Sequence, residues 1–233
     1  LGYSLKVHLN NSCLESMLKY ADSKQCYAYG DPSLGFFLPD KAKCEEVIEK
    51  DILVARYFNF KDDDTFRDFV NSPVLEGIAK GYLGNAARRV ATQLWWSFPA
   101  DVDDATRSEA AHFFHRDVDA WAFLKFFFYL SDVGPGDGPH VYIEASHKPS
   151  VFSQIVIEKL RIKRHSDDSV RSRFGESAVT PIFGAAGAGI VVDTFGFHKG
   201  ESPETHPRLM LCAVYATEDY GVQDFIANQH ELR

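Results

Sequence analysis

The hydrophobic periodicity of the chain changes near residue 88, and this change limits the folds that the chain can adopt. From there to residue 217, apolar residues recur at every second position within short segments, and Gly and Pro separate the segments. Alternation of this kind is typical of β-strands with one buried face. It predicts a mainly β domain, in which two sheets pack together or one sheet closes on itself. The expected strands are 89–98, the strand end 113–117, 123–133, 141–145, 179–183, 189–194 and 208–217.

Two of these strands, 123–133 and 141–145, are expected to form a hairpin. The residues between them read GPGDGP, a composition typical of turns. Further along, residues 153–162 are predicted to form a helix. Residues 163–177 are polar, charged and without period, which favours a mobile loop or lid.

The segment before residue 88 has helical periodicity instead, apart from one expected strand at 52–58. Ser72 followed by Pro73 is a typical helix start, because the hydroxyl can cap the first turn and Pro fits the first helical position. Gly84 lies where that helix should end. We expect these helices to pack on the outside of the β core.

Composition excludes several classes of protein. The 233 residues suffice for one large domain or two small ones, and we expect a single domain over 1–233, with a mostly helical part at 1–88 and a β core at 89–217. A net charge of −8 argues against a general nucleic-acid or acidic-membrane binder. No apolar run reaches the 18 residues of a transmembrane helix. The four cysteines form no CxxC pair, and we expect a reducing, cytoplasmic compartment.

Three residues from two separate segments of the sequence could together bind a metal ion. His115 and Asp117 are two apart at an expected strand end, so their side chains should point the same way. His198 follows a late strand, in a turn punctuated by glycine. Two His and one carboxylate on one face of iron leave three open positions, which a bidentate 2-oxo acid and dioxygen can fill. Taken singly, the pair could be a surface pair and His198 a structural histidine.

Arg208 begins the last apolar strand, ten positions after His198. An arginine that enters the interior of a β-barrel needs an anionic partner, because an unpaired buried charge is costly. The distal carboxylate of 2-oxoglutarate could be that partner, held by two hydrogen bonds from the guanidinium. An internal salt bridge is the alternative.

In order and spacing, these signals resemble the phytanoyl-CoA dioxygenase family of iron(II)/2-oxoglutarate oxygenases. The similarity runs from about residue 51 to 217, and several motifs occur in the family's order. They are residues 52–58, 82–84, 115–117, 124–133, 138–148 and 193–200, followed by Arg208. Ala145 stands where the family has Gly, and residues 1–50 carry no resemblance.

The resemblance implies a double-stranded β-helix, also called a jelly roll or cupin-like fold. It implies that His115, Asp117 and His198 are catalytic and bind Fe(II), and that Arg208 binds the C5 carboxylate of 2-oxoglutarate, with O2 as the second co-substrate. The implied reaction is hydroxylation of a small-molecule C–H bond, with release of succinate and CO2. Halogenating relatives have Ala or Gly in place of the carboxylate, so Asp117 favours oxygenation over halogenation.

Five further residues are candidates for ligand contacts. In relatives, the side chain at the position of Lys125 can face the co-substrate. An ion pair between Lys125 and a carboxylate of the core is the alternative. Gln93 and Ser97 share one strand face with Trp95 and are candidates for hydrogen bonds to the co-substrate. Trp95 and Trp121 are candidates for substrate contact, and Trp121 could instead be a packing residue at the rim.

Two other functional classes remain open. One is a non-oxygenase metal protein of cupin type, such as an isomerase or a sensor. The other is a catalytically inactive binding module. The expected partner is a small molecule whose identity the sequence does not reveal. The basic residues of 161–173 could meet an anionic substrate, or could be a solvated loop. The oligomeric state is also unknown.

Overall fold

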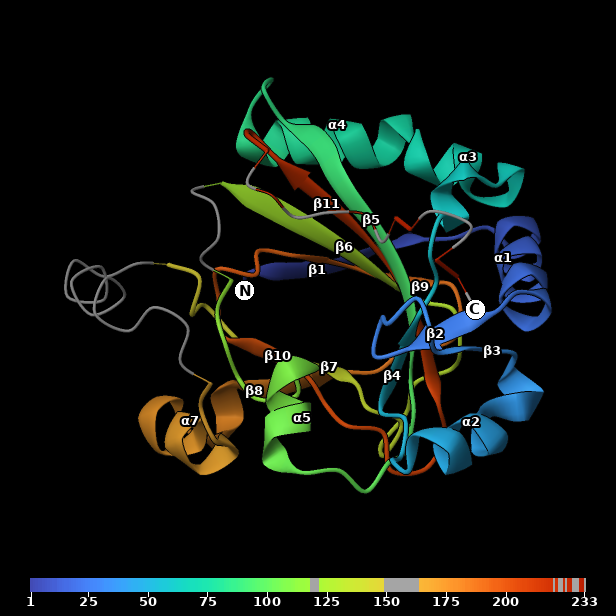
Figure 1. Cartoon of the computed structure of the whole chain (residues 1–233). Coiled ribbons are helices and arrows are strands. Elements are labelled where there is room, and N and C mark those ends of the chain that lie inside the picture. The colour runs from blue at the N-terminus through green and yellow to red at the C-terminus, as the bar shows by residue number, and fades with distance from the viewer. Residues whose placement is uncertain are drawn as a thin grey trace.

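The computed structural model describes residues 1–117, 122–148 and 164–219, together with residues 221, 224, 226–227 and 231–232. Two antiparallel sheets face each other across the interior (Figure 1). The larger has the strand order β1-β9-β6-β11-β5-β4-β2-β3, and the smaller has the order β10-β7-β8. Together they form the predicted jelly roll, or double-stranded β-helix, with flanking helices.

Helices and short strands alternate in the first half of the chain, and strands dominate the second. The strands are β1 (Tyr3–His8), β2 (Cys26–Ala28), β3 (Gly35–Phe36), β4 (Val54–Arg56), β5 (Arg88–Ser97), β6 (Phe123–Tyr129), β7 (His140–Ile143), β8 (Val179–Ile182), β9 (Ala188–Val192), β10 (His198–Gly200) and β11 (Arg208–Ala216). The helices are α1 (Asn11–Ser23), α2 (Lys41–Ile48), α3 (Asp64–Val70), α4 (Pro73–Leu83), α5 (Asp104–Glu109) and α7 (Asp167–Phe174). No described helix is both long and apolar enough to span a membrane. The helix expected at 153–162 lies outside the described residues.

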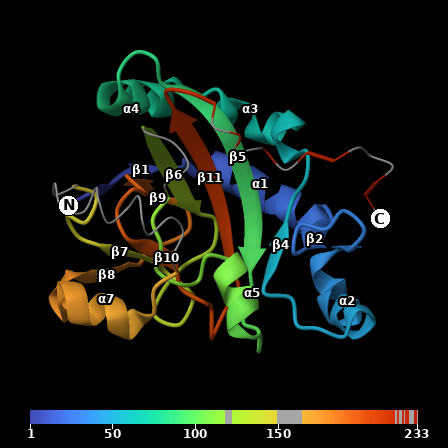
Figure 2. The ribbon, with the colours of Figure 1, turned by 60° about the vertical axis from the view of Figure 1, so that its left-hand side comes forward.

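The large sheet has an inner face, toward the small sheet, and an outer face. Strand β11 lies between β5 and β6 (Figure 2). Met210 on β11 is opposite both Tyr129 on β6 and Trp95 on β5. Opposite residues of antiparallel strands share a face, so every second residue of these three strands points inward. The inward apolar side chains pack in one cluster with Tyr142 and Ile182 of the small sheet.

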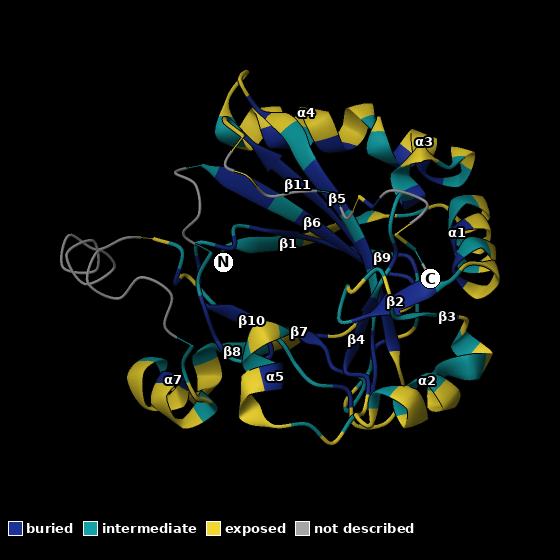
Figure 3. Ribbon diagram, in the orientation of Figure 1, coloured by how far each residue is buried: buried dark blue, intermediate teal, exposed yellow. Residues whose placement is uncertain are grey.

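The outer face carries the larger hydrophobic core, and helices α1, α3 and α4 cover it with their exposed sides toward solvent (Figure 3). Phe69 of α3, for example, meets Phe128 of β6 edge-on, with ring centroids 5.4 Å apart. Helix α4 begins and ends as predicted. The Ser72 hydroxyl accepts a hydrogen bond from Leu75 N (3.4 Å), and the helix stops at Gly84, whose φ is 93°.

The N-terminal part contains more strand than the sequence predicts. Strand β1 pairs with β9 at one edge of the large sheet, while β2 and β3 extend the opposite edge. Among the strands before residue 88, only β4 falls within an expected strand, 52–58. Side chains of β1 are intermediate or exposed along its whole length. An edge strand of this kind has no fully buried face, so its sequence lacks a clear alternation.

The expected hairpin between 123–133 and 141–145 is wrong. Strand β6 pairs with β9 and β11 in the large sheet, whereas β7 pairs with β8 and β10 in the small sheet. The turn residues 134–139 therefore carry the chain from one sheet to the other. Hydrophobic alternation marks a strand, but it does not show which sheet the strand joins.

The expected polar loop at 163–177 contains a helix. Residue 163 lies outside the described residues, but α7 begins after Ser166, whose hydroxyl accepts a hydrogen bond from Ser169 N (3.3 Å). Val170 is the one buried residue of this helix. A helix with so little buried surface has almost no hydrophobic period to detect.

Tyr129 joins the two sheets through its hydroxyl, which donates to Ile182 O (2.7 Å) and accepts from His140 N (2.8 Å). Replacing Tyr129 by Phe would leave both buried backbone groups without this partner. We expect the free energy of unfolding to fall by about 1–3 kcal/mol, measured by denaturant unfolding. Tyr215→Phe is the matched control, because the Tyr215 ring packs on Phe126 at the outer face and no hydrogen bond from its hydroxyl is seen among the described residues. Equal effects of the two variants would contradict the prediction.

Candidate metal centre

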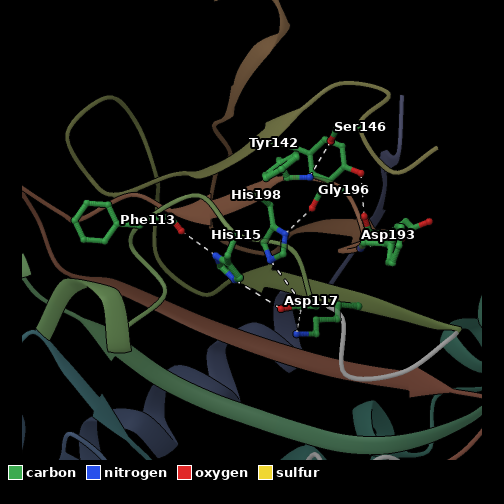
Figure 4. Close-up of polar contacts among 11 residues, drawn as sticks. Phe113, His115, Asp117, Tyr142, Ser146, Asp193, Gly196 and His198 are labelled. Atoms are coloured by element: carbon green, nitrogen blue, oxygen red, sulfur yellow. Dashed lines mark hydrogen bonds and ion pairs between the residues drawn. The ribbon is translucent and has the colours of Figure 1, made fainter. Parts of the chain in front are cut away.

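His115, Asp117 and His198 come together inside the jelly roll, as Figure 4 shows. One ligand atom from each lies within 4.8 Å of the others. His115 Nε2 is 3.6 Å from Asp117 Oδ1, and His198 Nε2 is 3.6 Å from Asp117 Oδ2. Two imidazole nitrogens and a carboxylate that converge in this way can hold one divalent metal ion.

Backbone hydrogen bonds between distant segments position these three residues. His115 and His198 exchange two of them, at 2.9 and 3.0 Å, where the first residue of β10 meets the segment before Asp117. Asp117 N donates to Thr194 O at 3.0 Å. The predicted convergence of the two side chains is therefore seen, but His115 makes an isolated bridge and not part of a regular strand.

Both imidazole rings are oriented by carbonyl groups. His115 Nδ1 lies 2.9 Å from Phe113 O, and His198 Nδ1 lies 3.0 Å from Gly196 O. A carbonyl accepts, so each Nδ1 carries the proton and each Nε2 offers a lone pair to the centre of the site. Burial and the neighbouring His198 lower the pKa of His115 to about 3, and burial also lowers the pKa of His198. Both rings are thus neutral at pH 7, as metal binding requires.

Asp117 is paired with Lys125 of β6, whose Nζ is 2.6 Å from Oδ2. Burial alone would raise the pKa of Asp117, but the charge and hydrogen bond of Lys125 act against it, and the pKa lies below the ordinary value. The carboxylate is therefore ionised. Of the two alternatives for Lys125, the structure shows the ion pair with a core carboxylate, and contact with a co-substrate stays a prediction.

The ion pair leads to a prediction about metal affinity. The ammonium group of Lys125 neutralises Asp117 and would repel an incoming cation. We expect Lys125→Met to tighten Mn(II) binding by on the order of tenfold, measured by calorimetry without oxygen. Lys125→Arg keeps the charge and is the control. Weaker binding in Lys125→Met would mean instead that the lysine positions Asp117 for the metal.

Arg208 is 2% exposed and faces the same interior. Its Nη2 donates to Ser97 Oγ (3.2 Å), whereas Nε and Nη1 are buried and have no hydrogen-bond partner among the residues that the structure describes. An internal salt bridge, the alternative from the sequence, is not seen in the described part of the chain. Gly200 leaves space beside the guanidinium, since a Cβ there would lie 3.2 Å from Nη2. A carboxylate beside the guanidinium would give one of these free donors a partner.

The remaining predicted residues are placed as follows. Gln93, Trp95 and Ser97 are opposite Cys212, Met210 and Arg208 on β11, so all three share the inner face. Ser97 hydrogen-bonds to Arg208, and the Trp95 ring meets Phe127 edge-on with centroids 6.4 Å apart. Their contacts with a ligand stay predictions. Trp121 lies outside the described residues.

Sequence reasoning missed His140, on β7. The residue is 4% exposed, and its ring stacks on His198 with centroids 5.5 Å apart. A signal exists, because His140 and Tyr142 alternate with two apolar residues and so share a face of the strand. This signal is missed because the expected hairpin pairs the strand of His140 with 123–133, in the large sheet, whereas the strand belongs to the small sheet.

No family model and no curated protein matches the chain. Solved structures do match it. HygX from Streptomyces hygroscopicus, with nickel and 2-oxoglutarate bound, has a TM-score of 0.59 at 14% identity and covers 92% of this chain and 82% of its own. The non-heme alpha-ketoglutarate-dependent epimerase SnoN from nogalamycin biosynthesis has a TM-score of 0.58 at 17% identity, with 92% and 78% covered.

EctD from S. alaskensis, with bound Fe, is a third similar structure. Its TM-score is 0.56 at 16% identity, with 98% of this chain and 77% of EctD covered. Identities this low show a common fold. The chain therefore shares its jelly-roll fold with HygX, SnoN and EctD.

Proposed function

We propose that this protein is an Fe(II)/2-oxoglutarate-dependent oxygenase. One observation carries the proposal, namely the metal-binding constellation and the unsatisfied Arg208 guanidinium in a single interior. His115, Asp117 and His198 would bind the metal ion. Arg208, with two buried donors free, would bind the C5 carboxylate of 2-oxoglutarate. The similarity to HygX, crystallised with nickel and 2-oxoglutarate, supports the same pair of ligands.

The residues around the site fit this chemistry. When bound, iron and 2-oxoglutarate activate dioxygen to oxidise a substrate C–H bond, with release of succinate and CO2. His115 and His198 supply neutral nitrogens, and Asp117 supplies one negative charge that lowers the net charge of a bound ion. Phe127 and Met210 line the interior and exclude water.

We further propose that the chain belongs with the phytanoyl-CoA dioxygenase family and that it hydroxylates a small molecule. The motifs from residue 52 to 208 support the family, and Asp117 favours hydroxylation over halogenation. HygX has also been crystallised with hygromycin B, which supports a small-molecule substrate.

Epimerisation is a second candidate, because SnoN is an epimerase with nearly the same similarity to this chain. The two reactions differ in their products. Hydroxylation adds one oxygen atom to the substrate, whereas epimerisation leaves its mass unchanged. A cupin-type protein that binds no 2-oxo acid is disfavoured, because Arg208 would then have no anionic ligand. A catalytically inactive module is disfavoured, because it would not need three converging metal ligands.

A substrate screen coupled to succinate release tests the proposal. The purified protein is supplied with Fe(II), ascorbate, 2-oxoglutarate and O2, and candidate small molecules are added singly. We expect succinate release that depends on iron and rises with a substrate, and product mass then separates the two reactions. Iron binding without 2-oxoglutarate binding or consumption would contradict the proposal and favour a cupin-type protein.

A further inference from the structure

His140 is a buried polar side chain inside the jelly roll to which the proposed function gives no role. Its Nε2 is buried and has no hydrogen-bond partner among the described residues. Leaving a buried polar group unpaired is costly, and most such groups have a partner. An unpaired nitrogen beside a proposed ligand site therefore points to a bound ligand as its partner.

Strand pairing places His140 beside the proposed metal ligands. In the antiparallel pair of β7 and β10, His140 is opposite Gly200, and Tyr142 is opposite His198. Alternate residues share a face, so His140 points into the same interior as His198. The two rings are stacked, with centroids 5.5 Å apart and an interplanar angle of 22°. On the large sheet, Phe127 faces His140 with centroids 5.0 Å apart.

The same pairing places His140 beside Arg208. Its partner Gly200 lies against the Arg208 guanidinium, because a Cβ added at this glycine would be only 3.2 Å from Nη2. His140 thus neighbours the proposed metal ligand His198 through the stacked rings and lies on the strand position beside Gly200, which contacts the Arg208 guanidinium. A 2-oxoglutarate that reaches from the metal to Arg208 would pass along this ring.

We propose that His140 is a further co-substrate-binding residue, which donates a hydrogen bond from Nε2 to the carboxylate that Arg208 holds. The proposal rests on the proposed function and assigns one more contact to it. A carboxylate accepts hydrogen bonds at about four lone-pair sites, so it can bind Arg208 and His140 together. His140 Nε2 and one of the two unpartnered nitrogens of Arg208 would then have a partner.

Calorimetry on the Mn(II)-loaded protein, without oxygen, tests the proposal through binding alone. His140→Phe keeps an aromatic ring against His198 but removes the donor, and His140→Leu removes the donor with a smaller side chain. We expect both to raise the Kd of 2-oxoglutarate by about 10- to 100-fold. His140→Gln keeps an N–H donor and should recover much of the affinity. If one variant fails to fold, the others still decide the result.

A second ligand separates hydrogen bonding from a merely structural role. 2-Oxovalerate has the same chain length as 2-oxoglutarate but lacks the distal carboxylate. Its Kd should therefore change less than about twofold in His140→Phe. The Kd of Mn(II) should also stay the same. Equal losses for both 2-oxo acids, weaker Mn(II) binding or unchanged 2-oxoglutarate binding would each overturn the role of His140. A wild-type protein that binds no 2-oxoglutarate would overturn the proposed function itself.

Discussion

Replacement of Asp117 by Ala is expected to abolish 2-oxoglutarate turnover and to weaken divalent metal binding by about 100-fold or more. Asp117 is the only carboxylate of the constellation among the described residues, and it contacts both imidazole nitrogens at 3.6 Å. Loss of an outer-shell partner alone typically costs 10- to 100-fold in metal affinity, so loss of a ligand should cost at least as much. Calorimetry with Mn(II) and succinate release with Fe(II) measure the two effects.

A loss of stability could imitate this result, because Asp117→Ala would remove the carboxylate that pairs with the half-buried ammonium group of Lys125. Breaking a fully buried ion pair on one side costs about 3–5 kcal/mol, and the partial exposure of Lys125 lowers this cost. The double variant Asp117→Ala/Lys125→Met removes both charges and should recover most of the free energy of unfolding. Metal binding should stay lost in the double variant. If metal binding returned with stability, Asp117 would not be a ligand.

Replacement of Arg208 by Met should raise the KM for 2-oxoglutarate by about 30- to 5000-fold. The expected loss of binding free energy is that of truncating one partner of a buried charge pair, about 2–5 kcal/mol. Arg208→Lys keeps the charge but loses the two-pronged geometry, so its KM should be intermediate. An unchanged 2-oxoglutarate requirement in Arg208→Met would reject the role of Arg208.

Thermal unfolding gives an independent measure of the same contact. Two nitrogens of the buried Arg208 guanidinium have no hydrogen-bond partner among the described residues, so Arg208→Met should be at least as stable as the wild type when no ligand is added. Added 2-oxoglutarate should raise the Tm of the Mn(II)-loaded wild type, because a ligand that binds only the folded state stabilises it. The rise should be largely absent in Arg208→Met.

The sequence predicts those parts of the fold whose signals are local. Ser72 and Gly84 mark the ends of α4, because capping geometry depends on adjacent residues alone. The nine residues of β11 are all buried, and a long apolar strand of this kind is readily recognised. The convergence of His115 and Asp117 is also predictable, since a spacing of two places side chains on one side of an extended chain.

What the sequence could not predict depends on contacts between distant segments. The three residues of β10 are too few for a periodicity, and the strand exists because it pairs with β7. Lys125 could have met a ligand or a carboxylate, and only the fold shows that Asp117 lies 2.6 Å away. His140 escapes prediction for the same reason, because its neighbours His198 and Gly200 come from another part of the chain.

The central position of β11 has a consequence for the order of folding. It is the last of the described strands, yet it lies between β5 and β6 in the large sheet (Figure 2). Arg208 and its partner Ser97 are 111 positions apart in sequence. Closing so long a loop is entropically costly, and distant pairings of this kind slow folding. Because Arg208 lies on β11, the proposed co-substrate site can form only when this strand pairs with β5 and β6, which joins segments far apart in the sequence.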